Sequence, residues 1–160
     1  MKKTEIFKSN IFSYLLPVIV LVIIPVVIFS LTGLPFTQFA FIIVLGALII
    51  TAGLILLVWS IILMERAGKG TLAPWAPASV MLTKGPYKHI RNPMISGVLY
   101  CLFGIWLISW NHWLLAWTAF FFICNVLYFK LSEEPGLVKR FGAEYIEYRK
   151  KTPMWIPKFK

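Results

Sequence analysis

The fold depends on one polar stretch between hydrophobic runs, which reads Leu82-Thr83-Lys84-Gly85-Pro86-Tyr87-Lys88-His89-Ile90-Arg91-Asn92-Pro93-Met94-Ile95-Ser96-Gly97. The stretch carries basic residues, two prolines and a tyrosine, and it leads directly into an apolar segment. Two long uncharged runs precede it, and two shorter runs and a charged tail follow it. Uncharged runs of this length are typical of membrane-spanning helices. We therefore expect two spans on either side of the stretch.

The composition is that of a membrane protein. Of the 160 residues, 59% are hydrophobic and 14% are charged, whereas roughly 25% of residues are charged in an average soluble domain. A soluble fold of this length could not hide so much apolar surface. We expect a single membrane domain over residues 1–160, in which residues 1–66 form a two-span anchor and residues 67–160 form a loop, a helical hairpin and a tail.

Four uncharged runs cover residues 11–31, 39–64, 94–110 and 113–129. The first two are long enough to cross roughly 30 Å of hydrocarbon, and the last two are near the lower limit. Pro17 and Pro25 are tolerated as kinks in a membrane helix, because neighbouring groups satisfy the freed carbonyls. Gly46 and Gly53 allow close contact with another helix. The predicted fold class is an all-α integral membrane protein with about four transmembrane helices.

The tail after Lys130 is amphipathic. Its charged residues, Arg149 among them, mostly occupy one face of a predicted helix. The other face carries residues at helical spacing, which are Leu137, Val138, Phe141, Tyr145 and Tyr148. Pro153 ends the pattern, and Met154-Trp155-Ile156-Pro157 follows as an apolar clip of the kind that rests at a membrane interface. We expect one amphipathic C-terminal helix at the cytoplasmic face.

All charged residues lie on one side of a four-span arrangement. Three basic residues precede the first span, five lie between Arg66 and Arg91, and eight follow from Lys130 onward. The turns on the other side, residues 32–38 and 111–112, carry no Lys, Arg, Asp or Glu. The positive-inside rule assigns the charged side and both termini to the cytoplasm. Topology and anionic membrane lipids explain the net charge of +10 better than nucleic acid as a partner does.

Arg91-Asn92-Pro93 marks the start of the third span. Asn is a preferred helix N-cap and Pro a preferred first helical residue, so we expect Asn92 to cap a helix that begins at Pro93. In a purely structural interpretation, this is a helix start at the membrane surface, with Arg91 reaching the lipid headgroups. In a functional interpretation, the free N–H groups of the first turn bind an anion. Both interpretations are open at this point.

Glu133-Glu134 lies on the same side of the membrane as Arg91. Pro135 disfavours helical geometry at Glu134, so we expect the fourth span to end near Ser132 or Glu133. Ser132 or Glu134 would then cap the tail helix. Alternatively, the two carboxylates belong to a binding site at the end of the helical bundle. The residues alone favour neither interpretation.

Other reactive residues form no known catalytic or metal-binding set. His89 lies in the basic loop and His112 in the opposite turn, so the two cannot share a metal, and no zinc spacing exists. The chain contains no Asp, which excludes a Ser-His-Asp triad. Its glycines match neither a phosphate loop nor a dinucleotide fingerprint. The sequence therefore indicates no metal and leaves His89 as a catalytic candidate.

Two separated motifs resemble one superfamily of membrane enzymes. The first runs from Gly70-Thr71-Leu72-Ala73-Pro74-Trp75 through residues 82–94, and the second joins Glu133-Glu134 to residues 141–153. Together they closely resemble the isoprenylcysteine carboxyl methyltransferases and their phospholipid methyltransferase relatives, over roughly residues 70–157. The resemblance implies an integral membrane methyltransferase of bacterial type, in the cell membrane of a bacterium or archaeon, that uses S-adenosylmethionine without a Rossmann fold.

The resemblance also implies which residues contact the cofactor. Carried over by position, they are Ser79, Val80, Met81, Leu82, Tyr87, Asn92, Pro93, Met94, Ile95 and Glu133, with Glu134 beside it. The family commonly has His where Asn92 stands and Tyr where Ile95 stands. Phe129 replaces an arginine that contacts substrate in the eukaryotic enzymes, so prenylcysteine is not the expected substrate. Arg91 and His89 are the candidates for orienting or deprotonating the acceptor.

The predicted function is methyl transfer to a small lipophilic or lipid-like acceptor at the cytoplasmic membrane face. Methyl transfer from a sulfonium needs little acid–base machinery, but it needs an aligned nucleophile and the exclusion of water. The helix N-terminus at Asn92 suits the cofactor carboxylate, and Glu133 suits its hydroxyl or amino groups. Two alternatives remain: a membrane reductase of the steroid-reductase type with a nicotinamide cofactor, and a non-enzymatic membrane partner protein.

Overall fold

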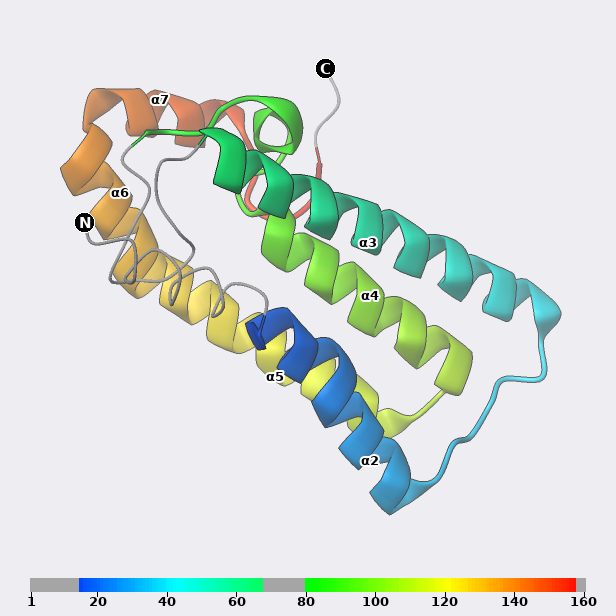
Figure 1. Cartoon of the computed structure of the whole chain (residues 1–160). Helices are drawn as coiled ribbons and strands as arrows, with labels where there is room; N and C mark the ends of the chain where they lie inside the picture. The colour runs from blue at the N-terminus through cyan, green and yellow to red at the C-terminus, as the bar shows by residue number, and fades with distance from the viewer. Residues whose placement is uncertain (1–14, 68–79, 158–160) are drawn as a thin grey trace.

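The computed structural model describes residues 15–67 and 80–157, and every regular element within them is helical (Figure 1). In chain order these elements are η1 (Ile19–Ile23), α2 (Ile24–Thr32), α3 (Ala40–Ala67), η2 (Gly85–Lys88), α4 (Pro93–Ser109), α5 (His112–Tyr128), η3 (Phe129–Glu133), α6 (Glu134–Phe141) and α7 (Ala143–Lys151). The prediction of an all-α fold is confirmed.

Three helices in the described residues are long and apolar enough to cross a membrane, and a fourth apolar helix is shorter. The long helices are Leu15–Thr32, Ala40–Arg66 and His112–Phe141, and the shorter one is Pro93–Ser109. At 1.5 Å per residue the shorter helix is about 25 Å long, which approaches the roughly 30 Å of a hydrocarbon core. This agrees with the prediction of about four transmembrane helices. The turn between α4 and α5 lies at one end of the bundle, and α6 and α7 lie at the other (Figure 1).

Helices α3 and α4 pack closely because glycines face each other across the contact. A Cβ added at Gly53 would lie 2.7 Å from the carbonyl oxygen of Gly97, and one added at Gly97 would lie 2.7 Å from that of Gly53. Gly46 and Gly104 repeat this pairing at 2.9 and 2.7 Å. Larger residues would not fit, so the two backbones approach each other closely. The predicted role of Gly46 and Gly53 is confirmed.

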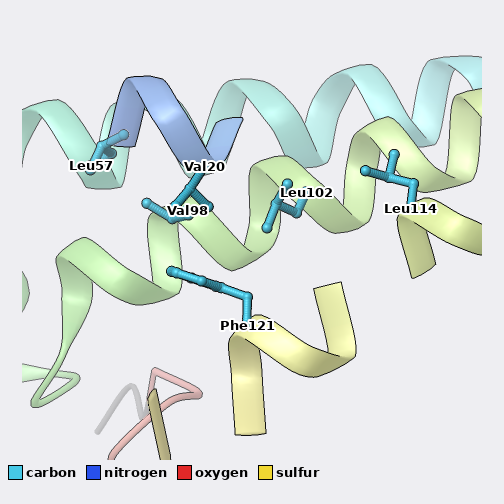
Figure 2. Close-up of a cluster of buried hydrophobic side chains, with 6 residues drawn as sticks. All are labelled: Val20, Leu57, Val98, Leu102, Leu114 and Phe121. Carbon is cyan, nitrogen blue, oxygen red and sulfur yellow. The ribbon is translucent and has the colours of Figure 1, made fainter. Parts of the chain in front are cut away.

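The apolar core joins the spans around α4 (Figure 2). Its buried residues are Val20, Leu57, Val98, Leu102, Leu114 and Phe121. Val20 comes from η1, Leu57 from α3, and Leu114 and Phe121 from α5, so all three neighbours meet on α4. Met94 and Ile95, in the first turn of α4, pack against the same cluster. The start of α4 is therefore held firmly relative to the rest of the bundle.

Asn111 fixes the end of the bundle that lies away from α6 and α7. Its Oδ1 accepts hydrogen bonds from the backbone N–H groups of Trp113 and Leu114, at 2.9 and 3.3 Å, and so caps α5. Its Nδ2 donates to Thr32 Oγ1 at 2.8 Å, at the end of α2. One buried side chain therefore joins two spans.

The helix of the fourth span continues through Pro135. The N–H of Glu134 donates to the carbonyl of Phe129, five residues back, and Glu134 has helical angles of φ −61° and ψ −45°. This π-turn gives the proline ring room where an α-helix would place a carbonyl against it. The predicted end near Ser132 or Glu133 is therefore wrong. The predicted capping of the tail helix is also wrong, because no side chain caps the start of α6.

The first span accommodates Pro25 in the same way. The N–H of Ile24 donates to the carbonyl of Ile19, five residues back, and the proline follows at once. The described helix continues from Leu15 to Thr32. The expectation that prolines are tolerated in this span is confirmed.

The tail forms two helices instead of the single amphipathic helix predicted. Gly142 separates α6 from α7 with φ +56° and ψ −129°, a conformation that favours glycine. The turn at Gly142 brings α7 back over η2, where Tyr148 Oη donates to the Tyr87 carbonyl at 2.5 Å. The periodicity of Leu137 to Tyr148 did not reveal this break, because one glycine between two apolar positions leaves the spacing unchanged.

Candidate functional site

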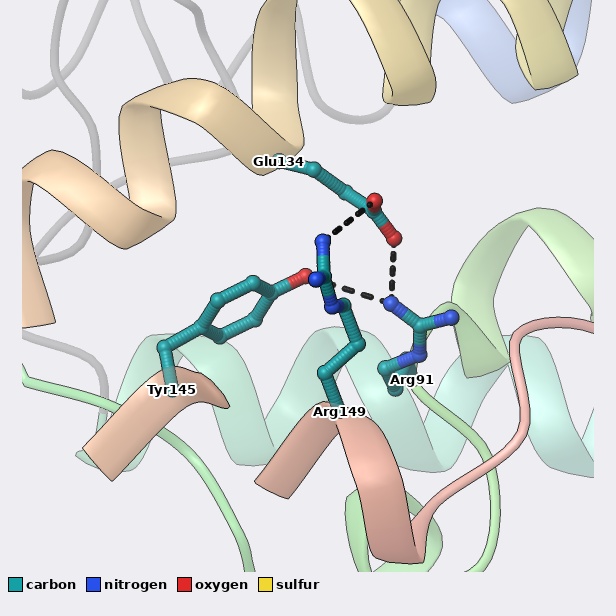
Figure 3. A network of polar contacts seen from close by, with 4 residues as sticks. All are labelled: Arg91, Glu134, Tyr145 and Arg149. Atoms are coloured by element: carbon teal, nitrogen blue, oxygen red, sulfur yellow. Dashed lines mark hydrogen bonds and ion pairs between the residues drawn. The ribbon is translucent and has the colours of Figure 1, made fainter. Parts of the chain in front are cut away.

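A partly buried polar network joins the polar stretch to the second glutamate of the pair (Figure 3). Arg91 Nη1 donates to Glu134 Oε1 in an ion pair, and Arg149 Nη1 lies 3.4 Å from Glu134 Oε2. The hydroxyl of Tyr145 lies 3.4 Å from Arg91 Nη1. The side chains of Arg91 and Glu134 are each only 13% exposed. Arg91 therefore faces the protein interior, not the lipid headgroups.

The polar network has the charge and a free hydrogen-bond donor to bind an anion. Two guanidinium groups share the single carboxylate of Glu134, so the cluster carries a formal net positive charge. Arg91 Nε is buried, and it has no hydrogen-bond partner among the described residues. A buried donor without a partner costs free energy, roughly 1–3 kcal/mol or more for a charged group. An acceptor atom bound at this nitrogen would recover that cost.

Tyrosines dock α7 onto the polar stretch and stay protonated there. Burial raises the pKa of Tyr145, and its hydrogen bond to Arg91 acts in the opposite direction. Burial also raises the pKa values of Tyr87 and Tyr148. Neutral hydroxyls serve as hydrogen-bond donors, as Tyr148 does toward the carbonyl of Tyr87. These tyrosines therefore support the structure of the site and do not act as bases at neutral pH.

The adjacent glutamates have different surroundings. Glu133 has a side chain that is 30% exposed, and its Oε1 lies 3.7 Å from Arg140 Nη2. Its Oε2 accepts a hydrogen bond from Tyr128 at 3.3 Å. Glu134 is more deeply buried and binds two arginines. Glu133 is thus the more accessible carboxylate, and Glu134 holds the surrounding elements together.

The start of α4 lacks the predicted cap. The helix begins at Pro93 as expected, but the side chain of Asn92 makes no capping hydrogen bond, and its backbone has φ −122° and ψ 61°. An N-cap residue is usually extended, which points its side chain at the first-turn N–H groups. The prediction that Asn92 caps this helix is therefore wrong. The side chain of Asn92 therefore does not occupy those N–H groups.

The comparisons with known proteins identify the family. A family model described as phospholipid methyltransferase matches residues 41–144, more than half of the chain. The chain belongs to the phospholipid methyltransferase family. No curated protein and no solved structure gives a match. The family model covers α3 to the first residues of α7, including Arg91 and the glutamate pair. The family consists of membrane methyltransferases, which agrees with the apolar helices and supports methyltransferase activity on membrane substrates.

The residues predicted to contact the cofactor lie in three kinds of surroundings. Ser79 lies outside the described residues. Val80 is exposed, and Met81 and Leu82 are half-buried in the segment that leads into η2. Tyr87 and Pro93 are buried, and Met94 and Ile95 pack against the core. Of these residues, Glu134 belongs to the described polar network, where it binds Arg91, which was predicted as a candidate for orienting or deprotonating the acceptor.

His89 lies at the end of η2, two residues before Arg91. Its backbone N–H donates to the Pro86 carbonyl at 3.0 Å, and the residue is half-buried. This position is at the same end of the bundle as the polar network. Within the described residues no group of three His, Cys, Asp or Glu side chains could hold a metal ion.

Sequence reasoning missed two members of the network, Tyr145 and Arg149. Arg149 was expected on the solvent face of the tail helix, but its guanidinium reaches Glu134. A signal was present, because residues four apart lie on one face of a helix and Tyr145 belonged to the inward set. The bend at Gly142 was also needed to bring that face back to Glu134, and it was not foreseen.

Proposed function

We propose that the chain transfers a methyl group from S-adenosylmethionine to a small lipophilic or lipid-like acceptor at the cytoplasmic membrane face. The main support is the meeting of Arg91 and Glu134, which are 43 residues apart, in a member of the phospholipid methyltransferase family. The α4–α5 hairpin returns the chain to the end from which it started. The two sequence motifs thereby become one site.

The residues at this end suit the chemistry of the cofactor. When bound, S-adenosylmethionine supplies an electrophilic methyl group on a sulfonium. Arg91 Nε and the first turn of α4, which Asn92 does not cap, suit its carboxylate. Glu133, with a partly exposed carboxylate, suits its ammonium or ribose hydroxyl groups. The residues at this end of the bundle are therefore chemically suited to bind S-adenosylmethionine.

The polar network positions the site and does not perform chemistry itself. The side chain of Arg91 is bound by Glu134 and Tyr145, which favours a role in orienting the bound groups. His89 is the residue proposed to take up a proton that the methyl acceptor releases. Methyl transfer depends mostly on alignment and on exclusion of water. The packing of α7 over η2 supplies a cover at the aqueous end.

We also propose which end of the helical bundle faces the cytoplasm. The end of the bundle with α6 and α7 carries the described Lys, Arg and Glu residues, whereas the turn at residues 111–112 carries none. By the positive-inside rule, the site and both termini then face the cytoplasm. The resemblance to bacterial-type members supports a bacterial or archaeal cell membrane. Residues 1–66 serve as the two-span anchor of a single membrane domain.

Thermal unfolding with different cofactors tests this function against its alternatives. A ligand at 100 times its dissociation constant adds about 2.7 kcal/mol of stability, so we expect S-adenosylmethionine to raise the melting temperature and NADPH to leave it unchanged. Tritiated methyl groups should then pass from the cofactor to a lipid extract. Stabilisation by NADPH alone would favour the reductase. A protein that responds to neither cofactor would be a membrane partner protein.

A further inference from the structure

The last described residues form a strap along the start of α4 (Figure 1, red). We call residues 152–157 the C-terminal strap. The backbone N–H of Arg91 donates to the carbonyl of Pro153 in this strap, at 2.9 Å. The guanidinium of the same Arg91 binds Glu134. The strap is therefore attached directly to the residue that links α4 to α6.

Trp155 fastens the strap to both helices of the hairpin. Its carbonyl accepts hydrogen bonds from Ser96 Oγ and Tyr100 Oη on α4, each at 3.2 Å. Its ring packs against Phe122 and Phe129, with centroids 5.5 and 5.8 Å away. The interplanar angles of 65° and 88° give the edge-to-face arrangement that aromatic rings prefer. We call Trp155, Phe122 and Phe129 the aromatic corner.

The aromatic corner lies between apolar surface and the polar network. Phe122 and Phe129 belong to the apolar helix His112–Phe141, and Phe129 is about one turn before Glu133. Phe122 is 39% exposed, and Ile156, next to Trp155, is 75% exposed. The exposed side of the corner is thus apolar, as a surface against lipid must be. The strap that carries Trp155 is bonded to Arg91 on its other side.

We propose that the aromatic corner is the wall against which the apolar part of the acceptor lies, and that Trp155 determines which acceptors fit. This rests on the proposed function. A lipophilic acceptor has to pass from the bilayer to the charged groups at Arg91, and the corner joins those two environments. Trp155 belongs to the strap, so a change there alters the wall without altering the spanning helices.

The test compares Trp155→Ala and Trp155→Phe with Ile156→Ala as the matched control. Methyl transfer from tritiated S-adenosylmethionine is measured against the concentration of a membrane lipid extract, and cofactor binding is measured separately. Loss of a large apolar contact is worth a factor of about 10 or more, so Trp155→Ala should raise the acceptor KM by about tenfold and leave the cofactor Kd within about twofold. Trp155→Phe and Ile156→Ala should stay close to wild type. Equal losses of cofactor affinity and methyl transfer in Trp155→Ala would overturn the proposal, because the strap would then only hold Arg91.

A second measurement does not depend on the cofactor. Vesicles of phosphatidylcholine with brominated acyl chains quench tryptophans that contact lipid. The wild type should lose more fluorescence in these vesicles than Trp155→Phe does. Equal quenching would show that Trp155 is shielded from acyl chains, which contradicts a wall for a lipophilic acceptor. A wild type that shows this quenching difference but does not bind S-adenosylmethionine would refute the proposed function, and it would leave only the contact of Trp155 with lipid.

Discussion

Arg91, two residues before the start of α4, forms an ion pair with Glu134, the first residue of α6. The chain between these two residues forms α4, α5 and η3 and crosses the bundle twice. The ion pair thus joins the two ends of this hairpin. Arg149 of α7 shares the same carboxylate. The ion pair therefore fixes three parts of the chain relative to one another at the end where the cofactor is proposed to bind.

Replacing Arg91 should cost far more stability than replacing Arg149. Arg91→Met leaves the mostly buried carboxylate of Glu134 with only the exposed Arg149 as a partner, and loss of a buried partner costs up to about 3–5 kcal/mol. Arg149 has a side chain that is 44% exposed, and an exposed pair contributes about 1 kcal/mol or less, so Arg149→Met should have a small effect. Unfolding in detergent by heat or denaturant measures both. Equal losses would show that the Arg91–Glu134 pair is not the main contact.

Replacing glycine by alanine should have opposite effects on stability inside and outside the contact between α3 and α4. Gly53→Ala would force a Cβ to within 2.7 Å of the Gly97 carbonyl, and overpacking of this kind costs about 1–3 kcal/mol. Gly136→Ala in α6 meets only the end of the Arg140 side chain, at 3.9 Å, so it should gain about 1 kcal/mol of helix propensity. Melting temperatures of the two variants should move in opposite directions. A stabilising Gly53→Ala would contradict the close packing.

Stability should fall at alkaline pH, and Tyr148 should contribute to the fall. Burial raises the pKa of Tyr148 above its ordinary value. The folded protein then keeps a proton that the unfolded chain loses near pH 10, so this contribution is complete below about pH 10 and declines above it. Tyr148→Phe removes the hydrogen bond to the Tyr87 carbonyl, at a cost of about 1 kcal/mol near neutral pH. Melting curves between pH 8 and 11 should show a shallower alkaline decline in the variant, and an unchanged slope would contradict the assignment.

The spans and their common charged end could be predicted because they follow from hydropathy and charge alone. Uncharged runs and the absence of charged residues at residues 111–112 do not depend on neighbouring elements. The continuation through Pro135 could not be predicted in this way. The local rule places a helix end before a proline, and the π-turn at Phe129–Glu133 removes the conflict on which that rule depends.

For the site, the sequence could predict only which chain segments the hairpin brings together. Arg91 and Glu134 were expected at the same end, and they meet there. The absence of an Asn92 cap depends on a ψ of 61°, and the contact of Arg149 depends on the bend at Gly142. Both are backbone conformations set by tertiary packing. Residue preferences alone do not predict these two conformations.

Equilibrium binding of radiolabelled S-adenosylmethionine to the purified protein tests the central claim most directly. Glu133→Gln should weaken binding by about tenfold or more, because it replaces the accessible carboxylate by a neutral group of the same shape. Glu147→Gln, which changes an exposed glutamate of α7 in the weak Lys151 pair, should bind as the wild type does. The account predicts this difference in a folded protein that binds the cofactor. A wild type that does not bind it, or equal affinities in all three proteins, would contradict the account.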